Sequence, residues 1–357
     1  MSKLNYLKKI FINGGFFILL LVITFYLIFR HQNIGEIIHT VTKVNPVCII
    51  IAVGCMCMFV FCEAVNIGRT LRIYSYNTSL AKCIKYALAG FFFSAITPMA
   101  SGSQPAQIYY MYRDGIEISH SALALMMELG SFQLITVVMA VLAYIAKFSF
   151  FSAAGYQIKY ILLVGVILNT LILIIILMAF FSKTLLQKCI NGILLLLKKL
   201  HFKKIEQKRA KINNQVELYH EGAAAFKNNK ITVLKIILTT FLQVVAFHSI
   251  PFWIYKAFGY NEYHFLTVLA IQAVLYITAS AIPVPGSVGA SESGFILVYR
   301  TLFPAQVLNS AMLLSRGISF YLFVCISGTF LLIFHIVNRG SHMDYKKAAI
   351  LKNKETV

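Results

Sequence analysis

Long apolar runs separated by short polar segments dominate the sequence. A helix that crosses a membrane needs about 20 mostly apolar residues. Uninterrupted runs of about this length or longer fall at residues 11–29, 47–65, 119–146, 160–181, 231–255 and 306–337. This pattern predicts an all-α fold, a polytopic membrane helical bundle.

Two further apolar stretches are interrupted in the middle by proline and glycine. The first covers residues 86–112 and breaks at 98–104, and the second covers residues 265–303 and breaks at 283–289. Proline removes a helical N–H group and clashes with the preceding turn, so neither stretch can form one straight helix.

The distribution of basic residues decides how the broken stretches sit, because Lys and Arg collect on the cytoplasmic side. If both stretches crossed the membrane, residues 182–230, with eleven Lys/Arg and three acids, would lie outside. If each returned to its own side, 24 basic residues would lie inside and six outside. We therefore expect six full spans plus two oppositely oriented re-entrant helical hairpins, with both termini cytoplasmic.

The two breaks also resemble each other. Ser-Ala-Ile precedes each of them, and Gly-Ser lies within each, as Gly102-Ser103 and as Gly286-Ser287. Weak similarity between oppositely oriented broken helices is typical of an inverted repeat with a binding site near the midplane of the membrane. Chance similarity between two kinks is the alternative.

Composition agrees with this picture. Hydrophobic residues make up 59% of the chain and charged residues 12%, whereas soluble domains carry about 25% charged residues. The formal net charge of +20 follows from the basic loops, so we expect no nucleic-acid partner. We expect residues 1–337 to form the membrane domain, with a cytoplasmic basic helical insert at 182–230, and residues 338–357 to form a basic cytoplasmic tail.

Motifs for nucleotide or metal chemistry are missing from the sequence. It contains no Gly-x-x-x-x-Gly-Lys-Ser/Thr loop, no His-Glu-x-x-His and no Gly-x-Ser-x-Gly. The seven cysteines lack paired zinc-site spacing. We therefore expect no cofactor, no metal and no catalytic residue in this chain.

After each break the chain restarts as a half-helix, whose free N–H groups and positive dipole end can bind an anion such as a lipid phosphate. Ser103 or Gln104 in the first hairpin, and Ser291 in the second, are expected to cap these helices. Alternatively, the helix ends satisfy each other or bind water.

Ionisable residues within apolar segments are costly to bury and often functional. Arg316 lies about ten residues into the last span and is either a phosphate ligand or the partner of a buried acid. Glu128 and Glu292 are its candidate counter-charges, although an acid at a helix start, as Glu292 is, can simply stabilise that helix. Glu63 is expected near a span end, where its side chain can reach the interface.

Four motifs carry a family resemblance: Ser94-Ala-Ile-Thr-Pro98, Ser101-Gly-Ser-Gln-Pro105, Arg113-Asp-Gly115 and Ile282-Pro-Val-Pro-Gly-Ser-Val-Gly-Ala-Ser-Glu292. They resemble the lysylphosphatidylglycerol synthase transmembrane family, which includes the flippase half of the multiple peptide resistance factor. The resemblance extends over residues 10–337.

The resemblance implies a multi-pass protein of the bacterial cytoplasmic membrane that moves an aminoacylated or otherwise cationic phospholipid to the outer leaflet. Such transport lowers the negative charge of the cell surface and the binding of cationic antibiotic peptides. Full-length members add an aminoacyl transferase domain, which is not expected here. A membrane transferase such as phosphatidylglycerol lysyltransferase, and an ion-coupled transporter of small solutes, remain alternatives. A separately encoded lipid-modifying synthase and a second copy of the chain are further candidate partners.

The two breaks and the buried charges together form the candidate lipid-binding site. Its predicted members are Thr97, Pro98, Ser101, Gly102, Ser103, Gln104, Arg113, Glu128, Pro283, Pro285, Gly286, Ser287, Gly289, Ser291, Glu292 and Arg316.

Overall fold

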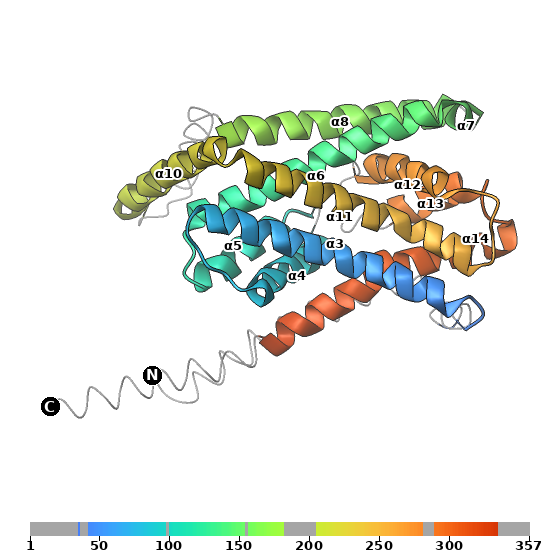
Figure 1. Cartoon of the computed structure of the whole chain (residues 1–357), viewed down its shortest axis with the longest axis horizontal. Coiled ribbons are helices and arrows are strands. Elements are labelled where there is room, and N and C mark those ends of the chain that lie inside the picture. Colours follow the sequence, from blue (N-terminus) through green and yellow to red (C-terminus); the bar gives the residue numbers. More distant parts are fainter. Residues whose placement is uncertain are drawn as a thin grey trace.

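The computed structural model describes Gly35 and residues 42–97, 100–153, 156–181, 205–280 and 289–334. Within these ranges the chain is helical, without any strand (Figure 1). The helices are α3 (Pro46–Ile73), α4 (Leu80–Ile96), α5 (Ser103–Arg113), α6 (Ile118–Ala146), α7 (Phe148–Ala153), α8 (Tyr156–Phe181), α10 (Ile205–Asn228), α11 (Lys230–Ala257), α12 (Phe265–Ser280), α13 (Ala290–Tyr299) and α14 (Ala305–Arg316). After α14, a π-helical turn, Gly317–Tyr321, leads into further helix.

Five of the expected spans are confirmed as helices that are long and apolar enough to cross a membrane. They are Pro46–Ile73, Ile118–Ala146, Leu162–Phe180, Lys230–Ala257 and Ala305–Phe334. The remaining expected span, residues 11–29, lies outside the described residues, as does the predicted tail at 338–357. The chain is therefore a helical, multi-pass membrane protein.

Helices α3 and α11 run antiparallel through the centre of the bundle (Figure 1). Asn45 caps α3 by accepting the N–H of Val47 at 3.0 Å, and proline follows as the first helical residue, a position that tolerates its missing N–H. The backbone N–H of Asn45 also donates to the Ala257 carbonyl at 3.0 Å, which ties the start of α3 to the end of α11. Further along, the Asn66 side chain donates to the Thr240 hydroxyl at 3.0 Å.

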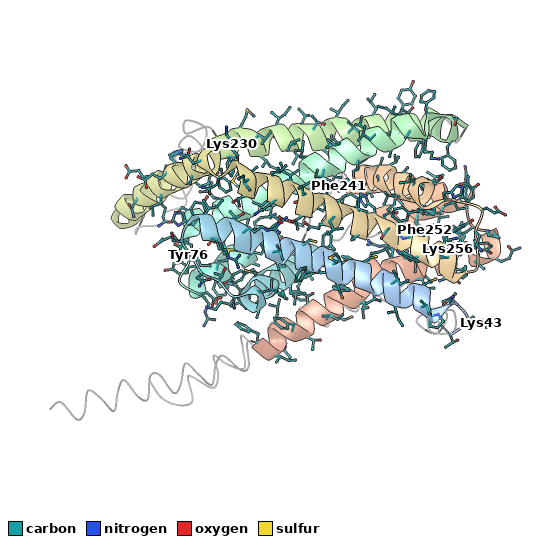
Figure 2. The ribbon with its side chains drawn as sticks, viewed as in Figure 1. Lys43, Tyr76, Lys230, Phe241, Phe252 and Lys256 are labelled. Atoms are coloured by element: carbon teal, nitrogen blue, oxygen red, sulfur yellow. The ribbon has the colours of Figure 1, made fainter. Side chains whose placement is uncertain are left out.

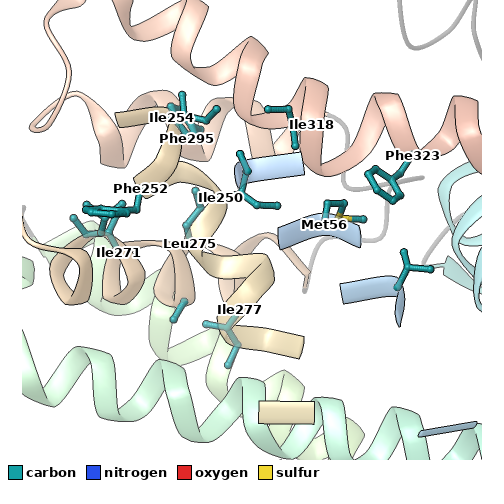
Figure 3. Packing of buried hydrophobic residues seen from close by; sticks show 14 of the residues in the cluster. Met56, Ile250, Phe252, Ile254, Ile271, Leu275, Ile277, Phe295, Ile318 and Phe323 are labelled. Atoms are coloured by element: carbon teal, nitrogen blue, oxygen red, sulfur yellow. The ribbon is translucent and has the colours of Figure 1, made fainter. Parts of the chain in front are cut away.

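A continuous apolar core joins these helices to α12, α13 and the last span. Figure 3 shows Met56 of α3, Ile250 of α11, Leu275 of α12, Phe295 of α13 and Ile318 of the π-helical turn within this cluster. By contrast, α8 exposes many large apolar side chains along its length, as a helix that faces lipid does.

The basic insert contains a helix that docks on one end of the bundle. The apolar face of α10 buries Tyr219 and Phe226 against Leu123 and Phe180. The Tyr219 hydroxyl donates to the Ala179 carbonyl at 3.1 Å. Of the predicted insert, residues 205–228 form α10, and residues 182–204 lie outside the described ranges.

Candidate functional site

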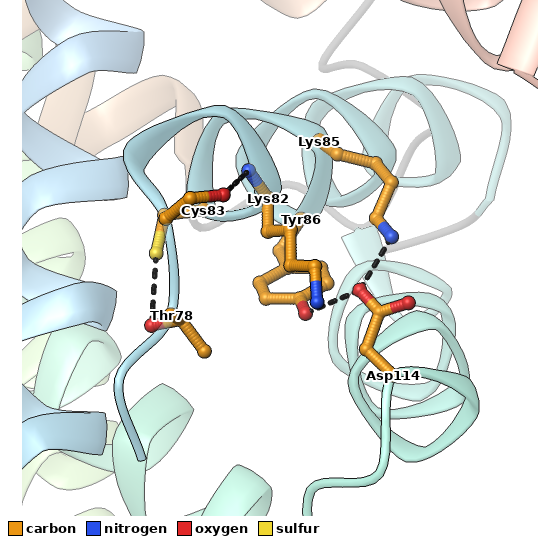
Figure 4. Close-up of polar contacts among 7 residues, drawn as sticks. Thr78, Lys82, Cys83, Lys85, Tyr86 and Asp114 are labelled. Carbon is orange, nitrogen blue, oxygen red and sulfur yellow. Dashed lines mark hydrogen bonds and ion pairs between the residues drawn. The ribbon is translucent and has the colours of Figure 1, made fainter.

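The first broken stretch folds into an antiparallel hairpin of α4 and α5. At its base, Asp114, just after α5, accepts both the Lys85 ammonium and the Tyr86 hydroxyl at 2.5 Å (Figure 4). The segment before α4 touches the segment after α5, because the Glu117 N–H donates to the Tyr76 hydroxyl at 3.2 Å. The chain therefore leaves this hairpin beside the place where it entered.

The tip of the first hairpin is held by Thr97. Its hydroxyl donates to the Phe93 carbonyl at 2.6 Å and accepts the Gly102 N–H at 2.8 Å. A side chain at Gly102 would place its first carbon 2.7 Å from the Thr97 methyl group. Glycine is therefore needed at position 102 to let the two arms close on each other.

The second broken stretch forms a hairpin of α12 and α13. The Tyr299 hydroxyl donates to the Gln272 side chain at 3.0 Å between the arms. At the base, the Tyr263 hydroxyl donates to the Thr301 carbonyl at 3.4 Å. This hairpin follows α11, whose end contacts the start of α3, whereas the first hairpin follows the end of α3. The two bases therefore lie at opposite ends of α3.

An ion pair lies at the inner end of the second hairpin. Glu292, in the first turn of α13, receives the Arg316 Nε–H and the Tyr321 hydroxyl on one carboxylate oxygen, each at 3.0 Å. Its other oxygen accepts the Gly289 N–H at 2.6 Å. Gly289 has φ +84°, a conformation that favours glycine. Arg316 and Glu292 expose 13% and 10% of their side chains, so the pair is largely buried.

Both hairpins reach the middle of the last span, Ala305–Phe334. On the side of the first hairpin, Phe92 and Ala95 pack in one cluster with Phe320 and Tyr321. On the side of the second, Tyr321 donates to Glu292. The π-helical turn at 317–321 lies at this junction, and such turns are frequent at functional sites.

A second group of buried polar side chains lies between α3, α6 and α11. The Asn66–Thr240 pair extends to Ser131, whose hydroxyl is 3.1 Å from that of Thr240. Glu128 is 8% exposed, and its carboxylate oxygens have no hydrogen-bond partner among the described residues. Asn66 and Gln243 lie near Glu128 without forming a hydrogen bond to its carboxylate.

Residues 12–327 match the family described as "Lysylphosphatidylglycerol synthase TM region". The chain belongs to this family. It is also similar to a UPF0104 membrane protein from Archaeoglobus fulgidus, with 23% identity over 298 residues that cover 83% of this chain and 89% of that protein. The resemblance seen in the hairpin motifs is thereby confirmed.

The prediction that Ser103 or Gln104 caps α5 and that Ser291 caps α13 is wrong. Gly102 and Gly289 occupy the N-cap positions, and Ser103, Gln104 and Ser291 lie within the first helical turns. No side chain caps α5, and the Glu292 carboxylate takes the exposed N–H of Gly289. The reason is local. Gly289 has φ +84°, and Gly102 lies too close to Thr97 to carry a side chain, so a glycine occupies each N-cap and the serines lie one or two positions into the helix.

Several other predicted site residues can be placed. Arg316 pairs with Glu292, one of its two candidate counter-charges, and Glu128 belongs to the separate cluster on α6. Arg113 is exposed at the end of α5, near the Tyr109 ring, and Ser101 is exposed in the turn before α5. Pro98, Pro283, Pro285, Gly286 and Ser287 lie outside the described residues.

Two polar residues of the first hairpin were missed by the sequence analysis, and Glu63 was misplaced. Glu63 does not lie near a span end, because α3 continues to Ile73; it accepts the Gln107 side-chain N–H at 2.8 Å. Gln107 is buried in α5, and Lys85, buried in α4, is the cation at the base of the hairpin. The Arg-Asp-Gly motif contains Asp114, the partner of Lys85, directly after Arg113, which was the predicted site residue.

No metal-binding group of three or more His, Cys, Asp or Glu side chains occurs within the described ranges. The polar groups that are present can pair with anions through Arg316 and with cations through Glu292, Glu128 and Glu63.

Proposed function

We propose that this protein is a lipid translocator of the bacterial cytoplasmic membrane, with six spans, two oppositely oriented re-entrant hairpins and cytoplasmic termini. The family description refers to the membrane region of a lysylphosphatidylglycerol synthase, which supports a phospholipid as the partner. The substrate is a modified phospholipid, aminoacylated or otherwise cationic.

The observation that carries this proposal is the meeting of two hairpins from opposite ends of α3 at the middle of the last span. Their bases return to where they entered, as the Glu117–Tyr76 and Tyr263–Thr301 contacts support. Irregular backbone at membrane depth is tolerated where protein buries it or where it lines a polar cavity. Opposed half-helices of this kind recur at the substrate sites of transporters with inverted repeats.

The polar junction at Glu292, Arg316 and Tyr321 gives the proposed substrate its binding partners. Arg316 can meet a lipid phosphate when Glu292 releases it, and Glu292 can then meet a cationic aminoacyl group. Exchange of an internal ion pair for two bonds to the substrate would let binding drive the opening of the junction, because a ligand shifts an equilibrium by its differential affinity for the two states.

The topology can be tested by cysteine labelling in a cysteine-free background. We predict that Cys at position 77, before the first hairpin, and at position 117, after it, react with an impermeant reagent from the cytoplasmic side. Cys at position 261, before the second hairpin, should react from outside. Labelling of positions 77 and 117 from opposite sides would contradict a re-entrant first hairpin.

The function can be tested with the purified chain and a panel of phospholipids that differ in headgroup. We expect reconstituted protein to move aminoacylated phosphatidylglycerol between leaflets faster than phosphatidylglycerol or phosphatidylcholine. Incubation with an aminoacyl donor and phosphatidylglycerol should give no new aminoacylated lipid. Formation of that lipid without any movement would instead support the transferase alternative.

A further inference from the structure

A basic cleft lies where the end of α3 meets the start of α11. Its volume is about 280 Å³, and it is lined by Arg69, Arg72, Ile73, Asn229, Thr232 and Lys235. Three of these side chains are basic and none is acidic. Figure 2 places Lys230 and Tyr76 towards this end of the bundle, and Lys43 and Lys256 towards the other.

Arg69 is held rigidly at the cleft. One of its terminal nitrogens donates to the Lys235 carbonyl at 3.0 Å, to the Thr239 hydroxyl, and to the Asn66 side chain at 3.5 Å. All three acceptors are neutral, so none compensates the charge. The other two guanidinium nitrogens make no hydrogen bond within the described part of the chain, which leaves them for an anion.

Arg72 and Lys235 are exposed, and neither forms an ion pair with any described residue. Arg72 also lies in the last turn of α3, where a cation stabilises the helix end. Lys235, however, is in the second turn of α11, near a positive helix end that gains nothing from a further cation. The ammonium group of Lys235 therefore does not stabilise its helix end, and its charge is available to an anion.

An apolar groove lies on the neighbouring side of the same helix turns. It has a volume of about 340 Å³ between α6, α8, α10 and α11, and Lys230, Val233 and Ile237 line it from α11. Positions 230, 233 and 237 share one side of a helix, and positions 229, 232 and 235 lie on the next side. The first two turns of α11 therefore present a basic cleft and an apolar groove next to each other.

We propose that the start of α11 is a binding site for an anionic phospholipid, distinct from the junction of the hairpins. The phosphate group is held by Arg69, Arg72 and Lys235, and an acyl chain lies in the groove. Arg69 supplies the planar pair of donors that matches phosphate oxygens. This site does not depend on translocation, so a protein that moves no lipid could still bind one here.

The experiment uses the full chain in detergent micelles, titrated with dioleoyl phosphatidylglycerol and followed by native mass spectrometry. The double variant Arg72→Gln/Lys235→Gln should bind the lipid about 30-fold more weakly, from the typical contribution of two cations at a membrane surface. The matched control Lys43→Gln/Lys256→Gln removes the same charge at the other end of the bundle. It should stay within about twofold of wild type, because screening limits exposed charges at long range.

Three ligand arms identify what the cleft recognises. Phosphatidylcholine should bind more weakly than phosphatidylglycerol, because its choline group brings a cation to a site without acids. Dihexanoyl phosphatidylglycerol should also bind more weakly if an acyl chain occupies the groove. Inorganic phosphate alone should not displace the dioleoyl lipid at equal concentration, and displacement would assign the cleft to a free anion and overturn the lipid site. If both double variants lost affinity for the dioleoyl lipid equally, binding would depend only on general surface charge. That result would also overturn the proposed site.

Discussion

Replacement of Arg316 by glutamine breaks the ion pair that links the second hairpin to the last span. Glu292 would keep the Gly289 N–H at 2.6 Å and the Tyr321 hydroxyl at 3.0 Å, but would lose its cation. Removing one partner of a buried ion pair typically costs about 3–5 kcal/mol. Because two hydrogen bonds to Glu292 remain, we expect a loss near the lower end, about 3 kcal/mol.

The assay is thermal unfolding of the purified protein in detergent. A loss of this size should lower Tm by roughly 4 °C, because a chain of 357 residues has an unfolding entropy of about 0.75 kcal/mol/K. The double variant Arg316→Gln/Glu292→Gln removes both charges and leaves two amides that can hydrogen-bond, so it should recover most of the lost stability. Arg113→Gln, at an exposed position on α5, is the matched control and should change stability by no more than about 0.5 kcal/mol.

The same variants separate the structural role of the pair from a role in transport. If Arg316 also binds the lipid phosphate, the double variant should be stable and still fail to move lipid. Arg316→Lys should then fail too, because lysine keeps the charge but lacks the planar pair of donors. An Arg316→Gln protein with wild-type Tm, or one that Glu292→Gln does not rescue, would refute the account of the ion pair.

Three further substitutions test the interior of the bundle. In Gly90→Ala the new carbon would lie 2.3 Å from the Gln107 amide nitrogen and would displace the hydrogen bond from Gln107 to Glu63. Loss of that bond costs about 1–3 kcal/mol and should outweigh the roughly 1 kcal/mol gained in helix propensity. By contrast, Gly54→Ala should stabilise α3, because the new carbon would meet nothing within 4 Å beyond the adjoining turns of its own helix. Glu128→Gln removes a buried carboxylate whose oxygens lack hydrogen-bond partners among the described residues, so Tm should stay level or rise; a clear fall would mean that this carboxylate is paired.

The spans were predictable because length and apolarity alone determine whether a helix can cross a membrane. The breaks were predictable because proline and glycine cluster there, whereas the isolated Pro251 lies inside α11 without ending that helix. The end of α3 was not predictable, because the apolar run stops near residue 65 while the helix continues to Ile73. Asn66 and Thr70 are buried against protein there, so the helix continues although its hydropathy falls.

The sequence limited the candidate partners of Arg316 to two acids but could not decide between them. Glu128 and Glu292 were both candidates for Arg316, because both are acids within apolar segments. Only the fold brings α13 beside the end of α14, where Glu292 pairs with Arg316, and leaves Glu128 in the separate cluster on α6. The Lys85–Asp114 contact was missed for the same reason, since it forms only when α5 folds back on α4.

Lipid translocation can be measured most directly by leaflet-resolved quenching in proteoliposomes. A headgroup-labelled lysyl-phosphatidylglycerol is distributed over both leaflets, and an impermeant reagent then bleaches the label that it can reach. In vesicles without protein, bleaching should stop at about half of the label, because uncatalysed movement of a charged headgroup through the apolar interior is slow. With the wild-type protein we predict that bleaching proceeds towards completion. A plateau at half in vesicles that contain correctly folded protein would contradict the proposal that this chain translocates lipid.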